Sequence, residues 1–330
     1  MRSLAPLFPE KTNLPEPIGE VWLTAVDCKI ATGPFAGKTL GEAWGEMPAE
    51  WRGTRFTELA DFPLLIKFIF PNDKLSIQVH PDDAYASVHE KTAGGRGKTE
   101  MWYVVSAEPG ASLLLGLKAG VTRESFLRAL EEHELEDLLQ RHSVQAGETY
   151  FVPARTPHTI GPGMVIYEIQ EYSDLTYRVY DYGRLGADGK PRELHVDKAL
   201  EVVNFGGSVP RAFRPEHPMD EKGSAYVEYL GACQYFAVEK WDGGGAKENT
   251  SPKQFELLTI AEGSGAIRSD RRDYESSTGQ TWFLPASLGE YIFSRDATIF
   301  RVYVPDVEAF DQMFVNKGYS EERRRRFIFP

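Results

Sequence analysis

The chain has 330 residues, of which 42% are hydrophobic and 12% aromatic, so it is long and apolar enough to form two packed domains. Its 49 acidic and 37 basic residues give a formal net charge of −12, which opposes binding to nucleic acid, and its two cysteines are too few for a disulfide scaffold or a cysteine-rich metal site. No run approaches the roughly 18 apolar residues of a membrane span, and the N-terminal segment lacks the apolar core of a secretion signal, so we expect a cytoplasmic protein without a membrane partner.

The first part of the chain consists mainly of short strand-like segments separated by glycine and proline. They cover residues 63–70, 75–80, 99–105, 148–153 and 164–172. Closely spaced segments of this kind are typical of an all-β sandwich or barrel.

Helical spacing interrupts this pattern in a few places. Apolar residues recur at helical intervals from Thr122 to His142 behind a Thr-x-x-Ser start, which predicts a small helical insertion at about residues 119–142. A second helix is predicted from Glu193 to near Gly206, and Asp82 and Asp83 are predicted to cap a short helix. The glycine-rich segment at 93–98 is interpreted as a flexible loop, since it lacks the spacing of a phosphate-binding loop.

Strand-like segments resume at residues 225–230, 235–241 and 255–269, after a proline-rich stretch that includes Pro210, Pro215 and Pro218. We therefore predict a boundary near residue 220, with a first domain at 1–220 and a second, related domain at 221–330. The run from Arg323 to Arg326 follows two glutamates and is interpreted as a solvated face.

The two halves share an internal repeat. Gly147 and Pro153 have the same spacing as Gly279 and Pro285, but the first copy ends in His158 and the second in Glu290. The histidine therefore has a role that only the first domain keeps.

Four polar residues of the first domain are spaced as metal ligands. Gln78 and His80 are two apart on a predicted strand and therefore point to one face. Glu100 begins another strand, and His158 closes the first copy of the repeat. Two imidazoles, a carboxylate and an amide oxygen inside a barrel favour a site with nitrogen and oxygen donors, for which zinc is the first candidate.

This set resembles the two-motif pattern of the cupin superfamily, whose members are small jelly rolls. More narrowly, "KLSIQVHPDD", "GKTEMWYV", "VPARTPHTI" and "SDLTYRVYDYGR" resemble the type I mannose-6-phosphate isomerases in their compact bacterial form. The resemblance runs from about Pro17 to Val203 and more faintly through the second domain. It implies a mainly β fold of two cupin-type double-stranded jelly rolls, with a helical insertion in the first and no metal in the second.

The resemblance also implies site residues. The family's zinc ligands, one Zn²⁺ per chain, match Gln78, His80, Glu100 and His158. Its active-site arginine matches Arg178, positions that line its pocket match Lys98 and Glu168, and its contact to the substrate phosphate matches Ser76. In the second domain the position of Glu100 falls near Phe255. The family's usual Trp-Gly-Gly segment ahead of Ile18–Trp22 is absent here.

The implied activity is a zinc-dependent aldose–ketose isomerase, which interconverts mannose 6-phosphate and fructose 6-phosphate through an enediol(ate). Arg178 would stabilise charge on oxygen, and Glu168 or Lys98 would carry the proton. Other basic residues near the motifs are candidates to hold the phosphate, namely Lys67, Lys74 and Arg184. The partner would be a small sugar phosphate, and the protein a monomer or weak homodimer.

Two alternatives stay open from the residues. One is a cupin oxygenase with ferrous iron at His80, Glu100 and His158. The other is a sugar-phosphate-binding cupin without turnover. Gln78 argues against the first, because a fourth protein ligand leaves fewer positions for dioxygen and substrate.

Overall fold

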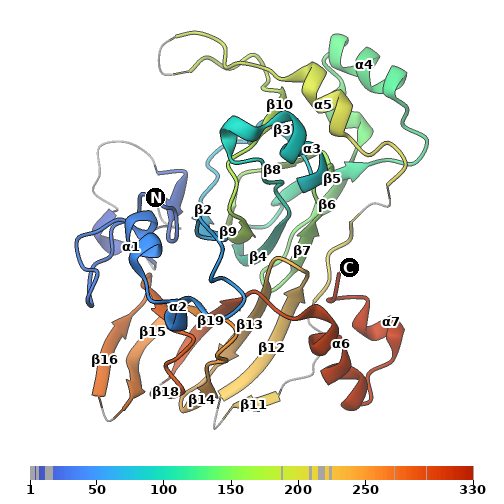
Figure 1. Ribbon diagram of the computed structural model, residues 1–330. Helices are drawn as coiled ribbons and strands as arrows, with labels where there is room; N and C mark the ends of the chain where they lie inside the picture. Colours follow the sequence, from blue (N-terminus) through green and yellow to red (C-terminus); the bar gives the residue numbers. More distant parts are fainter. Residues whose placement is uncertain are drawn as a thin grey trace. The chain divides into compact units, whose positions relative to one another are not determined.

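The computed structural model describes the chain except for residues 1–3, 5–6, 12–17, 187–188, 208–209, 215–219, 223–224, 271, 295 and 330. Pro215 and Pro218 of the predicted linker thus lie outside the described residues. By contacts the chain forms two units (Figure 1). The central unit comprises Gly19–Val21 and Phe68–Ala212, and the terminal unit comprises Met1–Ile18, Trp22–Lys67 and Phe213–Pro330. The domain boundary near residue 220 stays a prediction.

Two five-stranded sheets are built mainly from strands of the central unit. One has the order β1 (Glu20–Trp22), β2 (Leu64–Ile69), β9 (Met164–Glu171), β4 (Glu100–Ala107) and β7 (Thr149–Val152). The other has the order β10 (Tyr177–Tyr180), β3 (Ile77–Val79), β8 (His158–Ile160), β5 (Ser112–Leu117) and β6 (Leu139–Ser143). Non-consecutive neighbours and antiparallel pairing give the jelly-roll arrangement that the sequence predicted.

Alternation along these strands separates two cores. Trp102 and Val104 from β4 pack with Leu113 and Leu115 from β5 in one cluster, which therefore lies between the sheets. On the other face of the second sheet, residues such as Val79 pack against α4 (Arg123–Glu131) and α5 (Val196–Val202), which lie beside that sheet in Figure 1. Side chains at positions of even number in β3, β4 and β9 consequently face the interior.

The helical insertion is shorter than predicted. The Thr-x-x-Ser capping box is present, with Thr122 as the N-cap of α4. The helix ends at Glu131, because His133 has a left-handed backbone with φ of 61°. A 3₁₀ turn, η3 (Leu135–Leu138), follows, and residues 139–143 form β6 in register with β5. The prediction of a helix to His142 was therefore wrong.

The other predicted helices are present. Asp82 caps α3 (Asp83–His89), accepting a hydrogen bond from the Tyr85 N–H. The second predicted helix, α5, begins three residues after Glu193 and ends at Val202, where Val203 leaves the helical conformation. A short 3₁₀ turn, η2 (Lys91–Ala93), follows α3.

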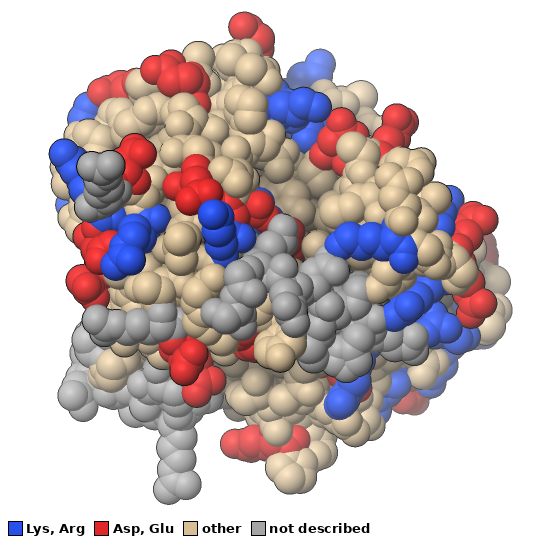
Figure 2. All heavy atoms as spheres, turned by 90° about the horizontal axis from the view of Figure 1, so that it is seen from below, with Lys and Arg blue, Asp and Glu red and all other residues tan. Residues whose placement is uncertain are grey.

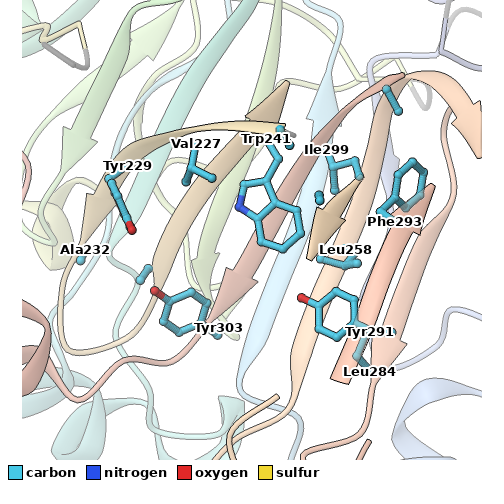
Figure 3. Packing of buried hydrophobic residues seen from close by; sticks show 14 of the residues in the cluster. Val227, Tyr229, Ala232, Trp241, Leu258, Leu284, Tyr291, Phe293, Ile299 and Tyr303 are labelled. Carbon is cyan, nitrogen blue, oxygen red and sulfur yellow. The ribbon is translucent and has the colours of Figure 1, made fainter. Parts of the chain in front are cut away.

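The terminal unit contains a nine-stranded sheet around its own core. Its strands are β11 (Asp220–Lys222), β12 (Ala225–Ala232), β13 (Ala237–Asp242), β14 (Ala246–Asn249), β15 (Glu256–Ser269), β16 (Arg272–Ser277), β17 (Thr281–Leu284), β18 (Glu290–Ser294) and β19 (Ala297–Tyr303). Strand β15 pairs with β17 and β19 along its first part and with β16 and β18 along its second, so it joins both halves of the barrel. Figure 3 shows Trp241, Tyr291 and Tyr303 among its buried residues.

The short helices of the terminal unit are η1 (Pro9–Lys11), α1 (Leu40–Glu46), α2 (Ala49–Arg52), α6 (Val307–Asn316) and α7 (Glu321–Arg324). Trp44 of α1 lies at the centre of an aromatic cluster, with its ring centroid 5.4 Å from that of Phe255. Phe56 and Phe62 join the cluster. Phe255 therefore packs α1 and the residues after it against the sheet of the terminal unit.

The arginine run is paired with acids of its own surroundings. Arg324 Nε lies 2.8 Å from Asp311, and Arg325 and Arg326 pair with glutamates one helical turn earlier. On the face shown in Figure 2, basic and acidic side chains are interspersed. Among the described residues, no helix is both long and apolar enough to cross a membrane.

Candidate metal centre

Three buried side chains of the central unit converge between the two sheets. His80 follows β3, Glu100 begins β4 and His158 begins β8, and their ligand atoms all lie within 4.8 Å of one another. Glu100 Oε1 lies 3.4 Å from His80 Nε2, and Glu100 Oε2 lies 3.8 Å from His158 Nε2. Gln78 lies directly opposite His158 in the pairing of β3 with β8, so the fourth predicted ligand shares the same face.

Backbone carbonyls fix the tautomers of both imidazoles. His80 Nδ1 lies 2.7 Å from the Leu175 carbonyl, and His158 Nδ1 lies 2.9 Å from the Thr156 carbonyl. Because a carbonyl can only accept, each Nδ1 carries the hydrogen and each Nε2 presents its lone pair toward Glu100. Such outer hydrogen bonds orient histidines that bind metals.

The donor set fits a divalent cation. His80 Nε2 and Glu100 Oε2 are fully buried and have no hydrogen-bond partner among the described residues. Two ligands at about 2.1 Å from a tetrahedral zinc are about 3.4 Å apart, close to the separations between Glu100 and the two imidazoles. Buried polar atoms without partners are costly, and a cation between them would satisfy these atoms.

The charges at the site favour the ligand forms of both groups. Burial, with the positive charge of Lys98, lowers the pKa of His80 to about 3, so the imidazole is neutral. Burial acts to raise the pKa of Glu100, but the positive charge of Lys98 opposes this effect, and the pKa of Glu100 lies well below its usual value. Lys98 Nζ lies 2.9 Å from Glu100 Oε1, and both side chains are buried.

The other predicted pocket residues lie on the same interior face. Glu168 lies opposite Trp102 in the pairing of β9 with β4, and its Oε2 accepts a hydrogen bond of 2.8 Å from Trp102 Nε1. Gln78 Nε2 donates to His158 Nε2 at 3.3 Å. Ser76 is buried just before β3, two residues from Gln78.

Arg178 lies beside the ligands and among other basic groups. It is directly opposite Gln78 in the pairing of β10 with β3, and its Nη1 donates to the Glu193 carbonyl at 3.0 Å. Burial lowers the pKa of Arg178, and the positive charges of Arg192 and Arg184 act in the same direction. Arg192 was not predicted from the sequence, and only its "KPR" turn signal marks the segment.

Asp181 pairs with Arg184, one of the basic residues proposed for phosphate from the sequence, and with Arg192. Its carboxylate lies 2.5 Å from Arg184 Nη2 and 2.7 Å from Arg192 Nε. Arg184 also donates to the Lys74 carbonyl, while Lys74 Nζ lies 2.7 Å from Glu136. Lys67 belongs to the terminal unit, where its Nζ lies 5.5 Å from the centre of the Trp22 ring.

Strand register identifies the counterpart of Glu100 in the terminal unit. Glu100 lies opposite Val152 in the first barrel, and Glu256 lies opposite Leu284 in the second. Val152 and Leu284 each precede the proline of the repeated motif. The position of Glu100 is therefore held by Glu256, the residue next to Phe255, near which the sequence predicted it.

A guanidinium lies inside the second barrel beside this carboxylate. Arg301 Nη2 is 2.6 Å from Glu256 Oε1, and its Nη1 is 2.9 Å from Glu239 and 3.2 Å from Glu248. Tyr291 donates to Glu256 at 2.8 Å. Glu290, which follows the motif at the spacing of His158, is instead exposed, and Lys247 Nζ lies 2.7 Å from it.

Comparisons with known proteins agree with this architecture. A family model for the catalytic domain of type I phosphomannose isomerases matches residues 3–101, and one for the cupin domain of mannose-6-phosphate isomerases matches residues 226–304. The chain is 37% identical over 279 residues to the mannose-6-phosphate isomerase ManA of Bacillus subtilis, which covers 83% of this chain and 85% of that protein.

Solved structures have a similar fold. The crystal structure of the mannose 6-phosphate isomerase from Bacillus subtilis has a TM-score of 0.81 at 30% identity and covers 91% of this chain and 94% of that one. A crystal structure of a mannose 6-phosphate isomerase bound with zinc and yttrium has a TM-score of 0.66 at 16% identity and covers 92% of this chain and 95% of that one.

Proposed function

Because this chain belongs to the type I mannose-6-phosphate isomerase family, we propose that it interconverts mannose 6-phosphate and fructose 6-phosphate at the centre formed by His80, Glu100 and His158. The observation that supports this site most strongly is the convergence of three buried ligand atoms whose lone pairs face one another. The family makes the chain an aldose–ketose isomerase, and the buried centre is where that chemistry would take place.

The residues present fit one zinc ion, which would be held by His80, Glu100, His158 and Gln78. Gln78 would turn its amide over, so that Oε1 instead of Nε2 faces the centre. Zinc at this position supplies Lewis-acid polarisation of a sugar oxygen. The hydrogen bonds of Nδ1 in both histidines keep the imidazoles in the orientation that this requires.

Isomerisation removes a proton beside a carbonyl and returns it to the neighbouring carbon, through an enediol or enediolate. The carrier must lie on the interior face and exchange protons, which Glu168 and Lys98 can both do. Glu168 is a buried carboxylate that already accepts from Trp102, and Lys98 is a buried ammonium beside Glu100. Arg178, which lies opposite Gln78, would hold the charge that develops on oxygen.

The phosphate is proposed to bind at the cluster of Arg178, Arg184, Arg192 and Lys74, with Ser76 as a hydroxyl donor. Arg184 and Arg192 share Asp181, while Lys74 pairs with Glu136. Arginine recognises phosphate through paired N–H groups, which suits this function. Lys67 remains a candidate for the same role.

Conversion of mannose 6-phosphate by the purified protein, with metal content measured in parallel, tests the proposal. We expect turnover with about one zinc per chain, loss of turnover after treatment with a chelator, and recovery on adding zinc. Fully zinc-loaded protein without turnover would instead identify a binding protein. Stoichiometric iron with oxygen uptake would identify an oxygenase.

A further inference from the structure

The segment that carries Lys98 is held by every one of its backbone amides. The N–H groups of residues 97–99 donate in turn to Asp83 Oδ1 at 2.7 Å, the Pro81 carbonyl at 3.0 Å and Glu171 Oε1 at 2.8 Å. The Glu171 N–H donates back to the Thr99 carbonyl at 3.2 Å. Two carboxyl side chains thus grip the chain immediately before and after Lys98.

These hydrogen bonds affect the candidate site because the ion pair between Lys98 and Glu100 forms only when the backbone directs the two side chains toward each other. Lys98 Nζ lies 2.9 Å from Glu100 Oε1, and both side chains are almost fully buried. A lysine has a long flexible side chain, so the direction of its backbone decides which groups its ammonium can reach. A shift of about 1 Å in such a group can lower turnover about 100-fold.

The segment that follows Glu171 also orients His80. Glu171 ends β9, and four residues later the Leu175 carbonyl accepts from His80 Nδ1 at 2.7 Å. Between them, Ser173 Oγ donates to the Arg96 carbonyl at 3.1 Å. Residues 171–175 therefore bond both to Thr99, next to Glu100, and to the imidazole of His80.

We propose that Glu171 is a positioning residue for the isomerisation: it acts through the Thr99 amide to aim Lys98 and Glu100, with Asp83 holding the other side of the segment. The inference rests on the proposed function, since it concerns the same site. It assigns a role to two carboxyl groups that belong neither to the proposed ligand set nor to the basic cluster.

The environment of Glu171 indicates that its carbonyl oxygen, rather than a negative charge, is needed to accept the hydrogen bond from the Thr99 N–H. Burial, together with nearby Asp83, raises the pKa of Glu171 to about 8, so at neutral pH the side chain is mainly a neutral acid. A neutral acid and a glutamine both offer a side-chain carbonyl oxygen to the Thr99 N–H. The role thus requires an acceptor oxygen, and a negative charge is dispensable.

Steady-state kinetics of zinc-loaded Glu171→Gln and Glu171→Ala test the proposal. We expect the glutamine variant to retain kcat within about threefold, and the alanine variant to lose about 10- to 100-fold in kcat with KM and zinc content unchanged. Equal loss in both variants, or a loss of zinc and KM along with kcat, would mean a general structural role and would overturn the inference. Absence of turnover in the wild type would count against the proposed function instead.

Gly97→Ala provides an independent test. An added Cβ at Gly97 would lie 2.6 Å from the Asp83 backbone nitrogen, so the segment must move away from α3. Gly45→Ala is the matched control, because a Cβ there meets nothing within 4 Å. We expect the Gly97 variant alone to lower kcat by about 10-fold or more while it keeps its zinc. Unchanged kcat in Gly97→Ala would contradict the positioning role.

Discussion

Arg301 Nη2 lies 2.6 Å from Glu256 Oε1 inside the second barrel, at the strand position where the first barrel has Glu100. Tyr291 and Tyr303 donate to the surrounding glutamates, and burial raises the pKa of both hydroxyls well above the usual value, so they remain donors. The cation beside these buried glutamates is therefore the guanidinium of Arg301.

We predict that Arg301→Met lowers the free energy of unfolding by about 3–5 kcal/mol, because Glu239 and Glu256 would be left buried without a counter-charge. Urea titration monitored by tryptophan fluorescence measures the change. Arg268→Met is the control, since its pair with Asp273 is exposed and contributes little. A variant at Arg301 as stable as the wild type would show that the glutamates do not need the cation.

Replacing Glu100 with alanine should remove both metal and activity. The variant loses the only carboxylate of the candidate centre and leaves the two imidazoles as neutral donors. We expect zinc content to fall from about one per chain toward zero and turnover to fall more than about 100-fold. Metal analysis after dialysis measures the first, with exposed Glu124→Ala in parallel. Retention of zinc by the Glu100 variant would disprove the proposed ligand set.

Replacing Arg178 with alanine should separate metal binding from turnover. The guanidinium contacts the Glu193 carbonyl and lies opposite Gln78, yet it is not a metal ligand. We expect zinc content to be unchanged and kcat to fall about 100- to 1,000-fold, as for the loss of a group that stabilises an oxyanion. Exposed Arg128→Ala serves as the control. Normal kcat in the Arg178 variant would remove this residue from the mechanism.

Stability should depend on pH through Glu171. Its pKa is about 8 in the folded protein against an ordinary value of 4.5, so the folded state binds more protons than the unfolded state between these values. Stability from this group is present below about pH 4.5 and is lost as the pH rises through about 8. Melting temperature should therefore decline less steeply over this range in Glu171→Gln than in the wild type. If melting temperature changed with pH equally in the variant and the wild type, the raised pKa of Glu171 would be excluded.

The convergence of His80, Glu100 and His158 could be predicted because its signals are local. Alternation places Gln78 and His80 on one face, and the repeated motif marks where His158 follows a strand. The capping residues Asp82 and Thr122 were predictable for the same reason, since each bonds a backbone amide within one helical turn.

The features that sequence missed depend on contacts between distant segments. Leu135, Leu138 and Leu139 are spaced as in a helix, but pairing with β5 makes residues 139–143 a strand. The grip of Asp83 and Glu171 on residues 97–99 needs three segments to meet. The counterpart of Glu100 could be predicted only to within one residue. Neighbouring residues of a strand face opposite sides, so Glu256 and Phe255 have different surroundings: Glu256 lies opposite Leu284, and Phe255 packs against Trp44.

The two barrels differ in how securely each keeps its positive charge. The ion proposed for the first barrel can be withdrawn by a chelator, whereas the guanidinium of Arg301 is covalently attached to the chain and stays there under any metal supply. Metal starvation would therefore remove the proposed catalytic ion of the first barrel and leave the buried cation of the second barrel in place.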